Sequence, residues 1–128
     1  MKLRCTENSI RIRIRKSELN ELAEKKLVEE KIHFGNQKTF TFALSIENAI
    51  RQVDAFFVND HLKISLPQEI ARQWISSNQV SIEANNKTDE RQSLHILVEK
   101  DFPCLDRPGE DKSDTFWELA SDTPDACQ

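Results

Sequence analysis

The sequence contains no tyrosine, only two glycines and no long apolar run, and each of these absences excludes a class of protein. Gly35 and Gly109 stand far apart, whereas phosphate-binding loops and dinucleotide fingerprints need clustered glycines. No stretch approaches the run of about eighteen apolar residues that marks a membrane-spanning helix. The sequence therefore argues against glycine-loop nucleotide binding and against a membrane protein.

Cysteine is also scarce, and its spacing excludes two common sites. Cys5, Cys104 and Cys127 form no CxxC pair, so a zinc ribbon or a thioredoxin-type site has no support. Reduced thiols are the plain interpretation. The first residues lack the apolar segment and the small-residue cleavage site of a signal peptide. We therefore expect a cytoplasmic protein.

The charges are unevenly distributed along the 128 residues, whose formal net charge is −4. Residues 101–128 hold eight acids against Arg107 and Lys112, a net charge of −6, which leaves +2 for residues 1–100. The length is that of one domain. We expect a single domain over residues 1–105 and an acidic, partly disordered tail over residues 106–128.

The first half of the chain predicts a strand, a helix and a hairpin. Ile10, Ile12 and Ile14 alternate with arginines, which is the period of a strand with one apolar face. Ser17 is expected to cap a helix whose apolar face includes Leu19 and Leu22. Two further alternating segments, residues 28–34 and 40–46, flank the turn at Gly35.

The second half repeats this order. Residues 62–66 alternate as a strand, Pro67 suits the start of a helix, and strands follow near residues 80–82 and 94–98. The apolar positions of the two halves match at offsets of 52 and, after a longer turn, 54. One more strand is expected between the halves, with Ala49, Ile50, Val53 and Phe56–Val58 as its members, before a turn at Asn59-Asp60. The prediction is an α+β fold: a small sheet or barrel of six or seven short strands with two helices, built from half-repeats at about 8–47 and 61–99.

Part of the second half resembles a known family. Residues 62–74 (LKISLPQEIARQW) and Val80–Glu83 are similar to the core of AbrB/MazE-type swapped-hairpin domains, in which a strand ending in Leu-Pro leads into a helix. Asn78-Gln79 replace the Gly-Asp that this family usually has before the next strand. The resemblance covers a small part of the chain. It implies a single-chain pseudo-dimer or a related small barrel, and its members are often dimeric DNA-binding regulators.

The whole chain also resembles a family of short bacterial proteins of unknown function. The resemblance lies in the alternating Ile/Arg strand at Asn8–Ile14 and in the closing segment Glu99-Lys100-Asp101-Phe102-Pro103-Cys104-Leu105. Gly109-Glu110-Asp111 and Asp114 follow that segment. This resemblance implies that the chain belongs to that family, and it implies no activity.

The closing segment contains the candidate metal ligands. A thiol and four carboxylates lie within eleven residues and can coordinate a divalent cation: Cys104, Asp106, Glu110, Asp111 and Asp114. No histidine is near them, although zinc and transition-metal sites usually recruit one. The alternative is a loop of solvated acids, which the sequence favours, so we predict no cofactor.

A second set of candidates is a basic stripe for phosphate groups. Its members are Arg4, Arg11, Arg13 and Arg15. The alternative is a sheet surface on which glutamates of neighbouring strands oppose the arginines, with Glu29, Glu47, Glu83 and Glu99 available. The overall acidity and the lack of tyrosine favour this structural interpretation. The three histidines, His33, His61 and His95, are isolated in the sequence and point to no catalytic group.

Three functions remain open. The sequence favours a non-enzymatic module that binds a protein or a small ligand as a monomer or homodimer, because it lacks any catalytic spacing. One alternative is an AbrB/MazE-like DNA-binding regulator or antitoxin that uses the arginine strand. The other is a metal- or thiol-dependent enzyme that uses the Cys104 segment.

Overall fold

The computed structural model describes residues 1–101 and has the expected α+β class. In chain order the elements are β1 (Lys2–Thr6), β2 (Ser9–Ile14), α1 (Lys16–Lys25), β3 (Leu27–Gly35), β4 (Lys38–Glu47), β5 (Asp54–Val58), β6 (His61–Pro67), α2 (Gln68–Ser76), β7 (Ser81–Lys87) and β8 (Ser93–Lys100). Neither helix is long and apolar enough to cross a membrane, as far as residues 1–101 show.

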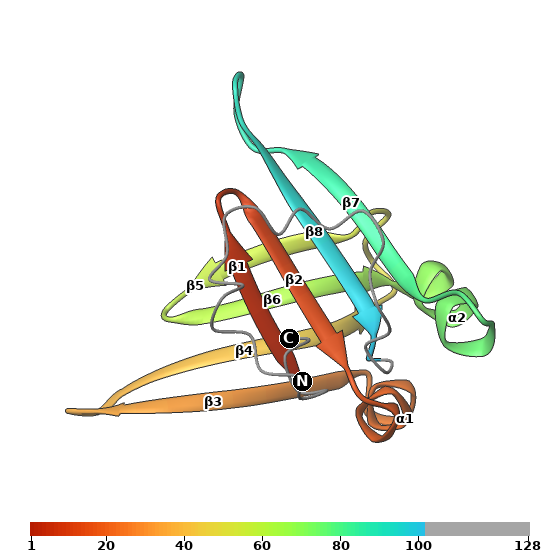
Figure 1. The fold of residues 1–128 in the computed structure, drawn as a ribbon, viewed down its shortest axis with the longest axis horizontal. Helices are drawn as coiled ribbons and strands as arrows, with labels where there is room; N and C mark the ends of the chain where they lie inside the picture. The colour runs from red at the N-terminus through yellow and green to blue at the C-terminus, as the bar shows by residue number, and fades with distance from the viewer. Residues whose placement is uncertain (102–128) are drawn as a thin grey trace, which may run out of the picture.

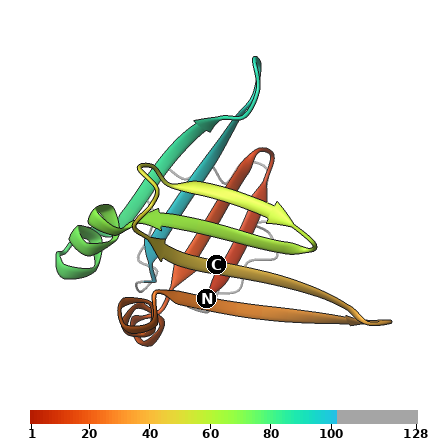
Figure 2. The same ribbon diagram turned by 180° about the vertical axis from the view of Figure 1, so that it is seen from behind.

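The strands form two open mixed sheets. Sheet A has the order β1-β2-β8-β7 and sheet B the order β3-β4-β6-β5. The sheets lie face to face with crossed strand directions, and both helices lie at one end of the sandwich (Figures 1 and 2). The sequence left open whether the strands form a sheet or a barrel. The described strands form open sheets.

The core fills the space between the sheets. In each central strand alternate residues are almost completely buried, as the period of two requires. The large apolar strand residues with 0–1% exposure are Ile12, Ile14, Leu44, Ile64, Leu66, Ile96 and Val98. In sheet B the intervening Ala43 and Ser65 are also fully buried. Leu22 of α1 and Trp74 of α2 join them from the helices. Burial of this apolar surface is the main force that holds the two sheets together.

The predicted duplication is present, and the two units exchange hairpins. Each unit consists of a hairpin, a helix and a second hairpin: β1 to β4 and β5 to β8. The first hairpin of each unit pairs through a parallel contact with the second hairpin of the other, β2 with β8 and β6 with β4. Each helix therefore carries the chain from one sheet to the other.

The strand registers repeat residue by residue. Ile12 pairs with Val98 in sheet A, and the equivalent positions at offsets of 52 and 54, Ile64 and Leu44, pair in sheet B. Hydrogen bonds outside the ladders repeat too. The N–H of His95 donates to Asn8 O at 2.9 Å, and its counterpart from Thr41 to Asp60 is 3.0 Å long.

The start of α1 differs from the expectation. The helix begins at Lys16 with Arg15 at the cap position, so the prediction that Ser17 caps it is wrong. The carboxylate of Glu18 accepts a hydrogen bond from the Arg15 N–H at 2.9 Å and so satisfies a donor at the helix start. Arg15 and Pro67 occupy equivalent cap positions before α1 and α2.

The strand expected from Ala49 to Val58 begins only at Asp54, as β5, because residues 48–53 form a connection without regular structure.

Strand β1 brings the number of described strands to eight, one above the expected range. It is an edge strand whose residues are mostly exposed, and Leu3 is its one aliphatic side chain. Because backbone pairing with β2 rather than burial holds it, no strong apolar alternation marks it in the sequence.

Candidate functional site

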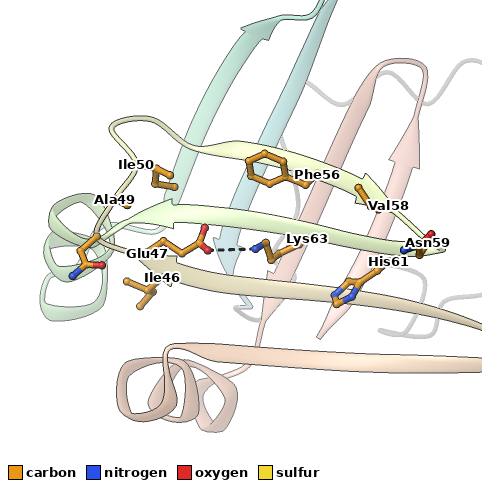
Figure 3. Close-up of a pocket in the computed structure, with 10 residues that line it drawn as sticks. Ile46, Glu47, Ala49, Ile50, Phe56, Val58, Asn59, His61 and Lys63 are labelled. Carbon is orange, nitrogen blue, oxygen red and sulfur yellow. Dashed lines mark hydrogen bonds and ion pairs between the residues drawn. The ribbon is translucent and has the colours of Figure 1, made fainter.

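A groove of about 770 Å³ lies on the outer face of sheet B. Strands β4, β5 and β6 and the β4–β5 connection contribute to it, as Figure 3 shows. Apolar side chains from Ile46, Ala49, Ile50, Phe56 and Val58 line it together with the polar residues Glu47, Asn48, Asn59, His61 and Lys63. This size and mixed lining are typical of small-molecule sites.

Strand periodicity places four of the groove residues on the outer face of sheet B. In β6, Leu62 and Ile64 are buried in the core, so His61 and Lys63 lie on the opposite face. Their register partners on β5 are Val58 and Phe56. These four side chains therefore stand side by side on adjacent strands.

A tight turn at one end and a hydrogen bond at the other hold β5 in place. A two-residue turn, Asn59-Asp60, joins β5 to β6 with φ values of 52° and 60°, which tight hairpin turns require. Before β5, the carbonyl of buried Val53 accepts a hydrogen bond from the Asn86 side chain at 2.7 Å. The connection that forms one wall of the groove is thereby tied to β7 of the other sheet.

An ion pair lies at the centre of the groove. Lys63 Nζ lies 3.3 Å from Glu47 Oε1 and 5.6 Å from the centre of the Phe56 ring (Figure 3). Hydrogen bonds from Ser65 and Lys63, and the charge of Lys63, lower the pKa of Glu47 against the effect of burial. The groove thus presents an ammonium group and a carboxylate next to an aromatic ring.

The equivalent face of sheet A is occupied by ionic contacts. Arg13 Nε lies 2.7 Å and Arg11 Nε 2.9 Å from Glu99 Oε1, and Arg13 Nη1 lies 3.9 Å from Asp101 Oδ1. Burial raises the pKa of Glu99, but the two arginines outweigh it and the net shift is downward. Arg13 and Glu99 are cross-strand partners.

The duplication places a different pair at the same position of sheet B. There Ser65 and Ser45 are cross-strand partners, and their hydroxyls lie 3.2 Å apart. The positions of sheet B that correspond to Arg11, Arg13, Glu99 and Asp101 hold Lys63, Ser65, Ser45 and Glu47. Ser65 and Ser45 are both buried and lie outside the groove lining, and the connection at residues 48–50 forms a wall that the groove needs.

The structure brings together three of the four predicted phosphate-binding residues. Arg4 pairs in register with Arg11, and Arg13 follows on the same strand face, so these three share the outer face of sheet A. Arg15 lies apart at the start of α1 and contacts Glu18 at 3.3 Å. Glu99 opposes Arg11 and Arg13, in the arrangement that the structural interpretation of the stripe describes.

The predicted metal ligands Cys104, Asp106, Glu110, Asp111 and Asp114 lie outside the described residues. Within residues 1–101, no three side chains of His, Cys, Asp or Glu lie close enough together to hold a metal ion. Of the histidines, His95 contacts Glu83 at 2.6 Å and His33 lies 3.1 Å from Thr39 Oγ1, while His61 lines the groove.

None of the groove residues was recognised as a site in the sequence. The sequence offers Glu47 only as a charge to oppose an arginine, and Phe56 and Val58 only as parts of a strand. The available signal was the position of Lys63 between Leu62 and Ile64, which places a basic residue on the outer face of a buried strand. The position of Lys63 in the sequence does not reveal that residues 48–50 form one wall of the groove.

Comparison with known proteins gives one match. The model of a family described as a family of unknown function, DUF7009, matches residues 1–119. Neither a curated protein nor a solved structure matches the chain. The expected membership of a family without known function is confirmed at this level, and the likeness of each half to swapped-hairpin domains stays a prediction.

Proposed function

Because the chain belongs to DUF7009, a family of unknown function, we propose its function from the geometry: a non-enzymatic cytoplasmic module that binds a small amphipathic ligand in the groove of sheet B. The observation that carries the proposal is the contrast between the two duplicated faces. Arginines and their counter-ions occupy the face of sheet A, whereas on sheet B the residues of β4, β5 and β6 and the connection at residues 48–50 surround a groove.

The lining suggests the chemistry of the ligand. Phe56, Val58 and Ile50 offer an apolar surface for a hydrocarbon or aromatic body. Lys63 is partly exposed and can accept an anionic group, which would share the ammonium with Glu47. The predicted ligand is therefore a small molecule with an apolar body and one anionic group.

Anilinonaphthalene sulfonate has this chemistry and serves as the probe. We expect its fluorescence to rise on binding, and the amide chemical shifts of β5, β6 and residues 48–50 to change most. Lys63→Gln should weaken binding about tenfold, as the loss of one charge-assisted hydrogen bond predicts. Lys31→Gln is the matched control, because Lys31 is an exposed lysine of the same sheet outside the groove lining.

Two results would reject the proposal. One is no binding at millimolar probe. The other is a set of shift changes centred on the tip of the β3–β4 hairpin, where exposed Phe34 offers a competing apolar surface. Equal affinities for the Lys63→Gln and unsubstituted proteins would reject the role of Lys63 while leaving the groove as the site.

A DNA-binding regulator is the second candidate. The exchange of hairpins between the two units favours it, because the resemblance to AbrB/MazE-type domains implies such a pseudo-dimer. We rank it lower because Glu99 already opposes Arg11 and Arg13. A salt-dependent gel shift that weakens with Arg4→Gln and Arg15→Gln would support it. The absence of a shift at low salt without competitor would remove it.

A metal- or thiol-dependent activity of the Cys104 segment is the third candidate, and it stays a prediction. Elemental analysis of protein purified without chelator, with thiol titration of Cys104→Ser against the unsubstituted chain, tests it. A metal-free protein whose Cys104 thiol reacts at an ordinary rate would exclude it.

A further inference from the structure

Strand β5 is an edge strand with an unusually apolar sequence. It ends sheet B, and three consecutive residues of it, Phe56, Phe57 and Val58, are 43%, 65% and 63% exposed. Phe56 and Val58 lie on the groove face, while Phe57 lies on the other face next to Phe40, with ring centres 6.5 Å apart. An exposed edge of this kind is a template for pairing with another strand.

The other described edge strands carry the charges that usually prevent such pairing. Strand β1, the equivalent of β5 in the first unit, contains Lys2 and Arg4. Strand β3 contains Glu29 and Lys31, and β7 contains Glu83 and Lys87. In β5 the one charged residue is Asp54, at its first position. Of the four edge strands among residues 1–101, β5 is therefore the one that carries no charge after its first residue.

The backbone of β5 also has donors and acceptors that point away from the sheet. In an antiparallel ladder alternate residues bond to the partner strand. The two-residue turn makes Val58 and His61 a bonded pair, so the amide groups of Ala55 and Phe57 point outward. In agreement, the Ala55 N–H donates to the Asp54 side chain at 2.9 Å instead of to β6.

We propose that β5 pairs antiparallel with β5 of a second copy, centred on Phe56, and joins two copies of sheet B into one continuous sheet. This register sets Ala55 of one copy opposite Phe57 of the other. The outward amide groups then exchange four hydrogen bonds across the two-fold axis, two of which replace the contact of the Ala55 N–H with Asp54. The register also sets a small side chain opposite a large one on the Phe57 face.

The charges at both ends of β5 favour a second copy over a foreign strand. Arg51 lies three residues before β5, and Asp60 lies two residues after it. Antiparallel pairing centred on Phe56 brings Arg51 of one copy beside the Asn59-Asp60 turn of the other, twice by symmetry. The Asp60 carboxylate is half-exposed, with Lys38 at 3.6 Å. The edge is thus complementary in charge to itself.

Sedimentation equilibrium of the full chain over a range of roughly 1–500 μM tests the pairing. One short strand forms a small contact, so we expect a dimer with a dissociation constant on the order of 100 μM. Phe57→Pro removes an outward N–H, which the ladder with β6 does not use, and should weaken association at least about tenfold. Cys5→Pro is the matched control, because Cys5 is the equivalent position of β1; it should leave the dimer intact.

A cross-link tests the register. In a chain with Cys5, Cys104 and Cys127 replaced by serine, Phe56→Cys places two thiols opposite each other at a non-hydrogen-bonded pair, with Cα atoms about 4.5 Å apart. Mild oxidation should join the copies. Val58→Cys is the control, since its two thiols would be roughly 13 Å apart.

Each other outcome overturns the inference. A protein that is monomeric at the highest concentration, or a dimer that Phe57→Pro does not weaken, would show that β5 is not the interface. Equal cross-linking at positions 56 and 58 would reject the register. The inference does not rest on the proposed ligand, because Phe57 lies outside the groove lining and Phe57→Pro should still bind the fluorescent probe there.

Discussion

The Glu99 carboxylate holds the outer face of sheet A together, because the guanidinium groups of Arg11 and Arg13 share one of its oxygens. Its side chain is 7% exposed, and that of Arg13 is 12% exposed. A buried pair of this kind adds little net stability compared with apolar side chains, yet the removal of one partner leaves the other charge uncompensated. The residue is therefore sensitive to substitution.

Replacement of Glu99 by glutamine should lower the free energy of unfolding by about 2–4 kcal/mol, because two partly buried arginines lose their counter-ion. Urea denaturation followed by circular dichroism measures the change. Glu69→Gln is the control, because it removes an ion pair with Arg72 in which both side chains are mostly exposed. It should change the free energy of unfolding by less than about 0.5 kcal/mol. Similar effects for both variants would contradict the role of Glu99.

The same carboxylate makes stability depend on acid. The pKa of Glu99 is lowered in the folded protein from its ordinary value of 4.5, so the stabilisation is complete above that value and is lost as the pH falls through the lower, folded value. The urea midpoint should therefore decrease below about pH 4.5 more steeply in the unsubstituted protein than in Glu99→Gln. Parallel curves for the two proteins would be inconsistent with this linkage.

At the scale of the elements, the hairpin turns differ in how well their residues suit the backbone. Asn36-Gln37 joins β3 to β4 with φ values of 50° and 60°, and Asn59-Asp60 joins β5 to β6 with similar values. Asparagine and aspartate tolerate this left-handed region, whereas glutamine rarely adopts it. The β3–β4 turn therefore stores a small conformational strain at Gln37.

Gln37→Gly should relieve that strain and raise the free energy of unfolding by about 0.5–1 kcal/mol, since it creates the Asn-Gly pair that such turns prefer. Gln37→Ala keeps a Cβ atom at the positive φ and serves as the control, with no expected gain. Urea denaturation of both variants distinguishes the two effects. A gain with alanine as large as with glycine would mean that backbone strain is not the cause.

Local patterns in the sequence were sufficient for most elements. The alternation around Ile12 and Ile64 predicted β2 and β6, and the offset between them predicted the duplication, since both follow from burial of every second residue. Strand β1 was missed, because only Leu3 and Cys5 mark it. The predicted cap at Ser17 is wrong, because Arg15 is the cap residue. Its N–H donates to the carboxylate of Glu18, which lies within the first turn of the helix.

The pairing of strands and the groove could not be derived in this way. The partner of Arg13 is Glu99, 86 residues away, and no local period specifies such a contact. The groove depends on a connection at residues 48–50 without regular structure, held by the contact of Val53 with Asn86. Both features arise only when the two units exchange hairpins.

At the scale of the whole molecule, the exchange makes the two units dependent on each other. Sheet A combines the β1–β2 hairpin of the first unit with the β7–β8 hairpin of the second. Sheet B combines the β3–β4 hairpin of the first unit with the β5–β6 hairpin of the second. Leu22 and Trp74, from equivalent positions of the two helices, belong to one common core. Neither unit can bury its apolar residues alone.

Separate peptides of residues 1–50 and 51–128 should each lack cooperative unfolding, and an equimolar mixture should regain the circular dichroism of the intact chain. A chain with a protease site inserted after Ile50 is the control, because cleavage after folding should leave the structure intact. A cooperative transition of either peptide on its own would contradict the mutual dependence of the units.

The arrangement of the sheets along the chain also predicts the order in which they form. Sheet B is made of one continuous stretch, residues 27–67, whereas sheet A combines residues 2–14 with residues 81–100. The central contact of sheet B closes a loop of 20 residues and that of sheet A one of 86, and short loops close at a smaller entropic penalty. During synthesis on the ribosome, β2 of the N-terminal hairpin can pair with β8 only after residues 93–100 have been synthesised. Pulse-labelled hydrogen exchange should therefore find the amides of β4 and β6 protected before those of β2 and β8.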